Sequence, residues 1–142
     1  MTEEINQIID EIFKLDSPKI INGEKRKQEI KEFTTITING DTITKYLVIN
    51  ANIKPRMPGA LLYILTNVRL IKIEIGKEAG INSSSFFLST MTSIERKLLG
   101  EGIFSIDIIF QNTSVGLKYS SSNMRITEFF QSIEQVKANK EK

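Results

Sequence analysis

The sequence predicts an α+β fold that consists mostly of antiparallel strands, with a helix near each end of the chain. Three observations lead to this prediction. Apolar residues recur with the period of an α-helix near both termini, and the middle of the chain shows the period of two that is typical of strands. The connections between the predicted strands are too short to hold the crossover helices of a parallel sheet.

Residues 3–14 form the first predicted helix. Its apolar side chains lie on one stripe, formed by Ile5, Ile8, Ile9 and Ile12. Thr2 is a candidate N-cap, and Ser17-Pro18 ends the helix. We expect the stripe to pack on the core. The next segment, residues 19–32, is polar, and its composition fits a short helix, a loop or the start of a strand.

From residue 33 the sequence pattern becomes that of strands. The stretch "TTITINGDTITKYLVI" has β-branched residues on both sides of Asn39-Gly40, a pair that favours the type I′ turn of a hairpin. Residues 52–59 contain two prolines, which do not fit a paired central strand, so they predict a loop. Two apolar runs, 61–65 and 69–75, then predict two strands.

The remaining strands are predicted by shorter patterns. "KEAGINSS" indicates a loop, and "FFLST" indicates a short strand that can continue through "MTSIE". "IFSIDIIF" and "VGLKY" are expected to pair across residues 111–114. One face of that hairpin carries Phe104, Ile106, Ile108 and Phe110. The total is about seven short strands.

The second predicted helix covers residues 123–137. Its apolar stripe consists of Ile126, Phe129, Phe130, Ile133 and Val136. Ser122 or Asn123 can cap its start. Because Phe129 and Phe130 are large and share the stripe, we expect this helix to plug the core.

Composition excludes several kinds of chemistry. The chain of 142 residues has no cysteine and no histidine, so it lacks a thiolate nucleophile, a zinc–thiolate site and the usual general base near neutral pH. It has no phosphate-binding glycine loop and no nucleophile elbow, and its carboxylates are scattered. We therefore expect no enzymatic activity, no cofactor and no metal site. The acidic, amphipathic N-terminus does not have the pattern of a secretory signal, so we expect a cytoplasmic protein without a transmembrane segment.

Four segments together resemble a known family. They are "LYILTNVRLIKIEI" (62–75), "FLSTMTSIE" (87–95), "GIFSIDIIFQNTSVGLKY" (102–119) and "ITEFFQSIEQV" (126–136). Their order resembles the pleckstrin-homology-like (PH-like) superfold, and more narrowly the bacterial PH-like and GRAM-type domains. The resemblance implies seven antiparallel strands in two near-orthogonal sheets, forming a barrel or sandwich that a C-terminal helix closes at one end.

This resemblance also suggests how the chain is divided. Residues 1–18 would be an additional N-terminal helix, 19–32 a polar connecting segment, 33–137 the PH-like domain and 138–142 a frayed tail. In such domains the "TNxR" segment is a tight strand connection. Thr66 and Asn67 are then turn residues, and Arg69 begins the next strand with its guanidinium on backbone carbonyls rather than on a ligand.

Two functions of different classes remain open. The leading expectation is a non-enzymatic, adaptor-type module that binds a protein or peptide by strand addition and can self-associate through the same edges. The alternative is a binder of anionic lipid or nucleic acid. Its candidate residues are the basic side chains in two polar segments: Lys25, Arg26, Lys27, Lys54 and Arg56. A net charge of +2 gives this alternative little support.

Overall fold

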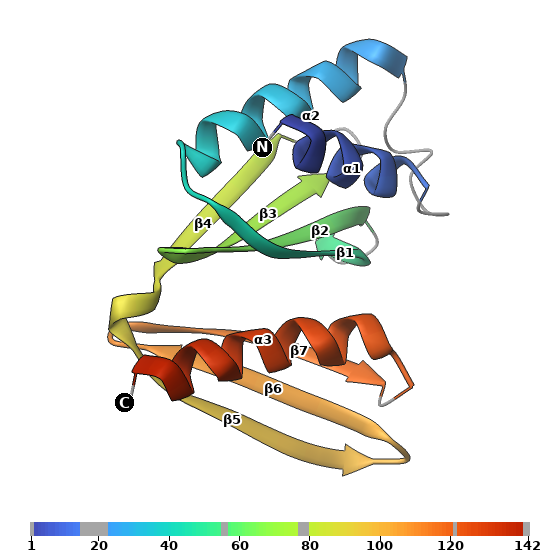
Figure 1. Ribbon diagram of the computed structural model, residues 1–142. Helices are drawn as coiled ribbons and strands as arrows, with labels where there is room; N and C mark the ends of the chain where they lie inside the picture. The colour runs from blue at the N-terminus through green and yellow to red at the C-terminus, as the bar shows by residue number, and fades with distance from the viewer. Residues whose placement is uncertain (1, 15–22, 55–56, 77–79, 121, 141–142) are drawn as a thin grey trace. The chain divides into compact units, whose positions relative to one another are not determined.

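The computed structural model describes residues 2–14, 23–54, 57–76, 80–120 and 122–140. Its elements are, in chain order, α1 (Thr2–Phe13), α2 (Gly23–Ile38), β1 (Ile43–Lys54), β2 (Met57–Thr66), β3 (Arg69–Gly76), β4 (Ile81–Phe87), the 3₁₀ turn η1 (Leu88–Thr90), β5 (Met91–Gly100), β6 (Ile103–Phe110), β7 (Thr113–Ser120) and α3 (Met124–Lys140). The chain forms two compact units, residues 1–85 and 86–142. Each unit is described by itself (Figure 1).

The first unit is a four-stranded sheet with two helices on one face (Figure 1). The strand order is β1-β2-β3-β4, and the β1–β2 and β2–β3 pairs are antiparallel. The predicted apolar stripe of α1 is buried, as are apolar residues of α2 and of three strands. This core consists of Ile5, Ile8, Ile9, Ile12, Ile30, Ile38, Ile43, Val48, Ala60, Leu62, Ile64, Ile71, Ile73 and Ile75.

Helix α2 replaces the predicted hairpin around Asn39-Gly40. The predicted first strand, "TTITI", forms the last turns of this helix, and the polar segment 19–32 supplies its first turns from Gly23 onward. A predicted domain boundary at residue 32 therefore falls within α2. The second half of the predicted hairpin is correct, because Ile43 begins β1.

The helical state of this β-branched stretch has a physical explanation. Ile30, Thr34 and Ile38 are spaced by four residues and are fully buried, so tertiary packing outweighs the strand propensity of the sequence. The hydroxyls of Thr35 and Thr37 donate to the carbonyls four residues earlier, at 2.8 and 2.7 Å.

The Asn39-Gly40 pair ends α2 instead of turning a hairpin. Both residues have positive φ angles, 48° and 85°. Positive φ is required in a type I′ turn and also in the left-handed residues that follow a helix. The sequence thus predicted the backbone conformation at this pair correctly but its structural context wrongly.

Two segments that were predicted as loops contain residues of strands. Within residues 52–59, only 55–56 lie outside the described elements, because β1 extends to Lys54 and β2 starts at Met57. Pro58 pairs with Asn52, and the described β2–β3 pairs run from Gly59 to Leu65.

The second of these segments, "KEAGINSS", also contains residues of a strand. Ile81–Ser84 are already part of β4, which ends at Phe87, and residues 77–79 lie outside the described chain. The predicted strand "FFLST" is correct only for its first two residues, since Leu88–Thr90 form η1. "MTSIE" opens β5, which continues to Gly100.

The second unit is a three-stranded antiparallel sheet with α3 lying across one face (Figure 1). Here the predictions are largely confirmed: β6 and β7 pair as a hairpin, and Ile106, Ile108 and Phe110 are buried. Asn123 caps α3, because its side-chain oxygen accepts a hydrogen bond from the backbone N–H of Ile126 at 3.1 Å. The helix extends through Lys140.

The predicted fold class is confirmed in its coarser features. The described chain is α+β, with seven strands in two sheets and helices near both ends. The number seven is correct although one predicted strand is helical, because "INSSSFF" and "MTSIE" belong to two separate strands. Within the described residues the sheets are not closed into a barrel, so the barrel form of the predicted barrel or sandwich is wrong.

Candidate functional site

Arg69 lies at the centre of a polar network in the first unit. Its Nε donates to the Asp41 carboxylate at 2.7 Å, and its Nη2 donates to the carbonyls of Thr37 and Ile38 at 2.8 and 2.9 Å. A third nitrogen, Nη1, reaches the Ser85 hydroxyl at 3.3 Å. Because Thr37 and Ile38 end α2, the guanidinium satisfies carbonyls that have no partner within the helix.

Thr66 and Asn67 fix the turn that positions Arg69. The hydroxyl of Thr66 accepts the backbone N–H groups of Val68 and Arg69 at 3.1 and 3.0 Å, and it donates to Asp41 at 3.0 Å. The side-chain oxygen of Asn67 accepts the backbone N–H of Thr42 at 2.9 Å. The "TNVR" segment therefore joins β2, β3 and the end of α2. Whether Arg69 has a structural role or a binding role stays a prediction.

Three of the five predicted basic residues, Lys25, Arg26 and Lys27, lie on α2 and differ in their contacts. Lys25 is exposed on α2, whereas Arg26 donates to the carbonyl of Gly76 at 2.9 Å and to Glu29 at 3.3 Å. Lys27 lies 3.7 Å from the carboxylate of Asp10 and 5.4 Å from the ring centre of Phe13. Contacts within the first unit thus engage Arg26 and Lys27.

The side-chain contacts of the two other basic candidates, Lys54 and Arg56, are not described by the structure. Lys54 is the last residue of β1, and Arg56 lies outside the described residues. The structure therefore does not test whether these two residues join Lys25 in an anion-binding surface.

Phe129 and Phe130 anchor α3 on its sheet. Each has a relative exposure of 1%. The ring of Phe130 stacks on Tyr119 at a centroid distance of 6.2 Å, and Phe129 meets Phe130 edge-on at 5.5 Å. These contacts hold the first half of α3 over β7 and leave the second half near β5.

Strand β5 has an open edge along its central residues. Within the described chain it pairs with β6 on one side only. The register of this pair shifts between Met91 and Ser93 and again between Leu98 and Gly100, which leaves Thr92 and Leu99 as bulges. Bulges interrupt regular pairing, so residues 93–98 form the regular stretch on which another strand could add.

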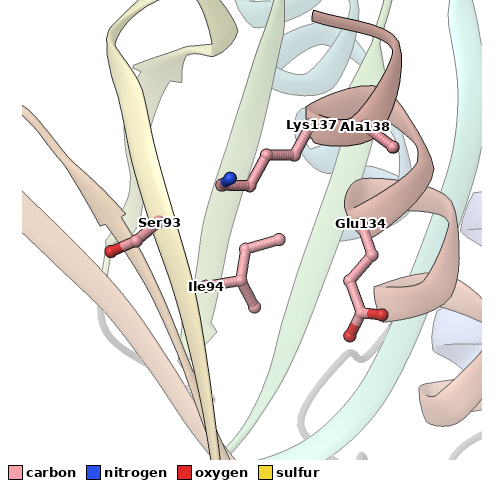
Figure 2. A pocket seen from close by; sticks show the side chains of 5 residues that line it. All are labelled: Ser93, Ile94, Glu134, Lys137 and Ala138. Carbon is pink, nitrogen blue, oxygen red and sulfur yellow. The ribbon is translucent and has the colours of Figure 1, made fainter. Parts of the chain in front are cut away.

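A depression of about 300 Å³ lies along this edge. It is lined by residues of β5 and of the last turns of α3: Ser93, Ile94, Glu134, Lys137 and Ala138. Ser93 and Ile94 point to opposite sides of the strand, so a space that touches both also touches the backbone at the strand edge. Figure 2 shows Ile94 and Lys137 pointing into the space between strand and helix. We call this depression the β5–α3 groove.

Charged side chains border the groove. Arg96 of β5 forms an ion pair with Glu134 of α3, and both side chains are more than a third exposed. Ile94 is half-buried and shares the α3-facing side of β5 with Arg96, because neighbours two apart in a strand share a face. The groove therefore offers the apolar side chain of Ile94, a strand edge and an exposed charge pair nearby.

Sequence reasoning did not identify the groove residues as a site. Arg96 and Lys97 were visible only as a basic pair after "SIE". The alternation Ile94, Arg96, Leu98 was a usable signal, but the sequence did not show that β5 is an edge strand. Nor did it show that Glu134, Lys137 and Ala138 on α3 lie beside that strand.

Other features of the described residues add no second site. They contain no group of three or more acidic residues that could hold a metal ion. No helix among them is long and apolar enough to cross a membrane. A depression of about 250 Å³ on α2 is lined by Gln28, Lys31, Glu32, Thr35 and Ile36, all on one helix, and borders no strand edge.

Comparisons with protein-family models, curated proteins and solved structures find no match to this chain.

Proposed function

We propose that this protein is a non-enzymatic interaction module of the PH-like type that binds an extended segment of a partner protein in the β5–α3 groove. The observation that carries the proposal is the depression at Ser93 and Ile94, on the open edge of β5 beside the end of α3. An added strand gains backbone hydrogen bonds from the edge, and its side chains gain contacts with Ile94 and the helix.

The arrangement of strands supports the PH-like part of the proposal. A four-stranded and a three-stranded antiparallel sheet are followed by a C-terminal helix, as the resemblance implies. The alternative, binding of an anionic lipid or nucleic acid through basic residues 25–27, has less support, because Arg26 and Lys27 are engaged within their own unit. We therefore favour a protein or peptide partner over lipid or nucleic acid.

The proposal is tested by filling the groove without disturbing the core. Ala138 is exposed and lines the groove, so Ala138→Trp should occlude it while the protein stays folded. Asn139→Trp places the same bulk on the next residue, which is also exposed, and serves as the matched control. Extended peptides from a random library, selected on the parent protein, should lose binding to Ala138→Trp and keep binding to Asn139→Trp.

Strand addition also has a direct spectroscopic signature. A bound strand should protect alternate backbone amides between Ser93 and Leu98 from hydrogen exchange, because alternate N–H groups of an edge strand point outward. Peptides that bind with equal affinity to the parent and to Ala138→Trp, and that protect no amide of β5, would refute the proposed function.

A further inference from the structure

The face of β5 toward α3 carries a defined pattern of side chains along its open edge. Ile94, Arg96 and Leu98 occupy alternate positions of β5. Their partners in β6 are, in the same order, Ile108, Ile106 and Phe104. The β6 residues of this set belong to the face on which α3 packs. The three β5 side chains therefore form an apolar–cationic–apolar row next to the place where an added strand would lie.

We infer that the β5–α3 groove selects an extended peptide with an acidic side chain between two apolar side chains, at alternate positions. This inference rests on the proposed function. Residues directly opposite each other in neighbouring strands lie on the same face and contact one another. An added strand in register with residues 93–98 therefore places one side chain against Ile94, the next on that face against Arg96 and the third against Leu98.

Burial and charge at these three positions support the assignment. Leu98 is 65% exposed, so an apolar partner side chain would remove apolar surface from water. The side chain of Arg96 is 39% exposed, and its guanidinium can present a planar pair of donors to a carboxylate. A basic side chain at the central position would instead face Arg96 with like charge, which is unfavourable in a cross-strand pair.

Glu134 already supplies a carboxylate to Arg96. Its ion pair with Arg96 joins α3 to β5 beside the groove. Because both side chains are more than a third exposed, the pair contributes little to stability and an incoming carboxylate can replace it. Glu134 therefore acts as an internal competitor for Arg96, and removing its charge should favour acidic peptides.

The experiment uses the full chain and three end-blocked peptides that differ at one residue. Their cores are Val-Thr-Glu-Thr-Val, Val-Thr-Gln-Thr-Val and Val-Thr-Lys-Thr-Val, and affinity is read from the shifts of the β5 amide resonances. The parent should bind the Glu peptide about two- to fivefold more tightly than the Gln peptide. The Lys peptide should bind more weakly than both.

Charge reversal at Arg96 supplies the decisive comparison. Arg96→Glu should invert the order, so that the Lys peptide binds most tightly. Glu134→Gln should strengthen binding of the Glu peptide about two- to fivefold more than it strengthens binding of the Gln peptide. Lys118→Glu is the charge-matched control, because Lys118 is exposed on β7 and does not line the groove. It should keep the parent's order.

The outcomes separate this inference from the proposed function. If all three peptides bind the groove with equal affinity, the acidic preference is wrong and the proposed function stands. A Glu preference that survives in Arg96→Glu also refutes the inference, because the carboxylate is then recognised elsewhere. If none of the three peptides or the library-selected peptides shifts a β5 amide, the proposed function fails, and this inference fails with it.

Discussion

At the scale of single residues, Arg69 connects three elements of the first unit. Its guanidinium bonds Asp41 and two carbonyls at the end of α2, and its side chain is only 15% exposed. Arg69→Ala would leave Asp41 and those carbonyls without this donor and should lower the free energy of unfolding by about 2–4 kcal/mol. Arg69→Lys should recover only part, because an ammonium cannot reproduce the planar fork.

Urea unfolding of the two variants measures this effect. Arg96→Ala is a matched control, because it removes an arginine from an ion pair whose side chains are more than a third exposed. It should cost no more than about 1 kcal/mol. A variant Arg69→Ala that unfolds like the parent but no longer binds peptide would show that this arginine contacts the ligand instead.

A second single residue, Tyr63, should make the stability of the fold depend on pH. Burial, with a smaller contribution from the nearby Glu74 carboxylate, raises the pKa of its phenol to about 12. In the unfolded chain the phenol ionises near pH 10. The unfolded state therefore releases a proton that the folded state retains, so stability is complete below pH 10 and falls between pH 10 and pH 12.

The loss from Tyr63 should reach about 2–3 kcal/mol at the upper end of this range. Unfolding free energies measured across the range should fall less steeply for Tyr63→Phe than for the parent, because phenylalanine has no proton to release. The chain has no tryptophan, so tyrosinate absorbance can be followed directly. In the parent, the phenol of Tyr63 should be the last to ionise, near pH 12. This last step should be missing in Tyr63→Phe. Equal slopes for both proteins would contradict the assignment.

At the scale of elements, α2 shows where local sequence information stops. The pattern of "TTITI" favours a strand, and the burial of Ile30, Thr34 and Ile38 that makes it helical depends on α1 and the sheet. In contrast, α1, α3 and the β6–β7 hairpin were predictable, because their apolar spacing agrees with their tertiary environment. Turn signals such as Asn39-Gly40 specify a backbone angle but not the elements on either side.

A substitution on the exposed face of α2 should change the free energy of unfolding in opposite directions for a helix and for a hairpin. Ile36 is 76% exposed. In a helix, replacing an exposed isoleucine by alanine should stabilise the protein by a few tenths of a kcal/mol, because alanine has the higher helix propensity. In the hairpin that the sequence predicted, the same change would destabilise the protein. The urea midpoint of Ile36→Ala therefore distinguishes the two structures, and a lower midpoint would contradict the helix.

The second half of the chain depends on the aromatic contacts of α3. Phe129→Ala and Phe130→Ala should each lower the free energy of unfolding by about 3–5 kcal/mol, because both rings are almost fully buried. Met124→Ala, at a 61% exposed position of the same helix, should change it by less than about 0.5 kcal/mol. Unchanged midpoints in both phenylalanine variants would refute the packing of α3 on its sheet.

At the scale of the whole molecule, the candidate site was less predictable than the fold. The sequence indicates which residues are basic, apolar or β-branched, but a groove depends on which strand is at an edge and which helix turn lies beside it. Lys25, Arg26 and Lys27 form the densest basic run in the sequence, yet the structure uses Arg26 and Lys27 to hold α2 against its neighbours. Dense charge in a sequence does not reveal whether that charge is already paired.

The overall charge of the chain leads to the last prediction, which concerns salt. Strand addition relies on backbone hydrogen bonds and apolar contacts, with one charge pair at Arg96, whereas an anionic surface would have to engage several lysines and arginines at once. Raising the salt from about 0.1 M to about 1 M shortens the Debye length from about 10 Å to about 3 Å. Peptide affinity should therefore fall less than about fivefold.

Binding to nucleic acid through all five basic candidates would respond much more strongly. With about five phosphate contacts, the affinity would fall more than about a thousandfold over the same range of salt. The net charge of +2 also gives little long-range attraction to such a surface. Isotherms for a library-selected peptide and for duplex DNA, measured on the same protein at both salt concentrations, separate the two functions. Tight DNA binding that disappears in high salt, together with peptide binding that is absent at both concentrations, would favour the anionic-surface alternative.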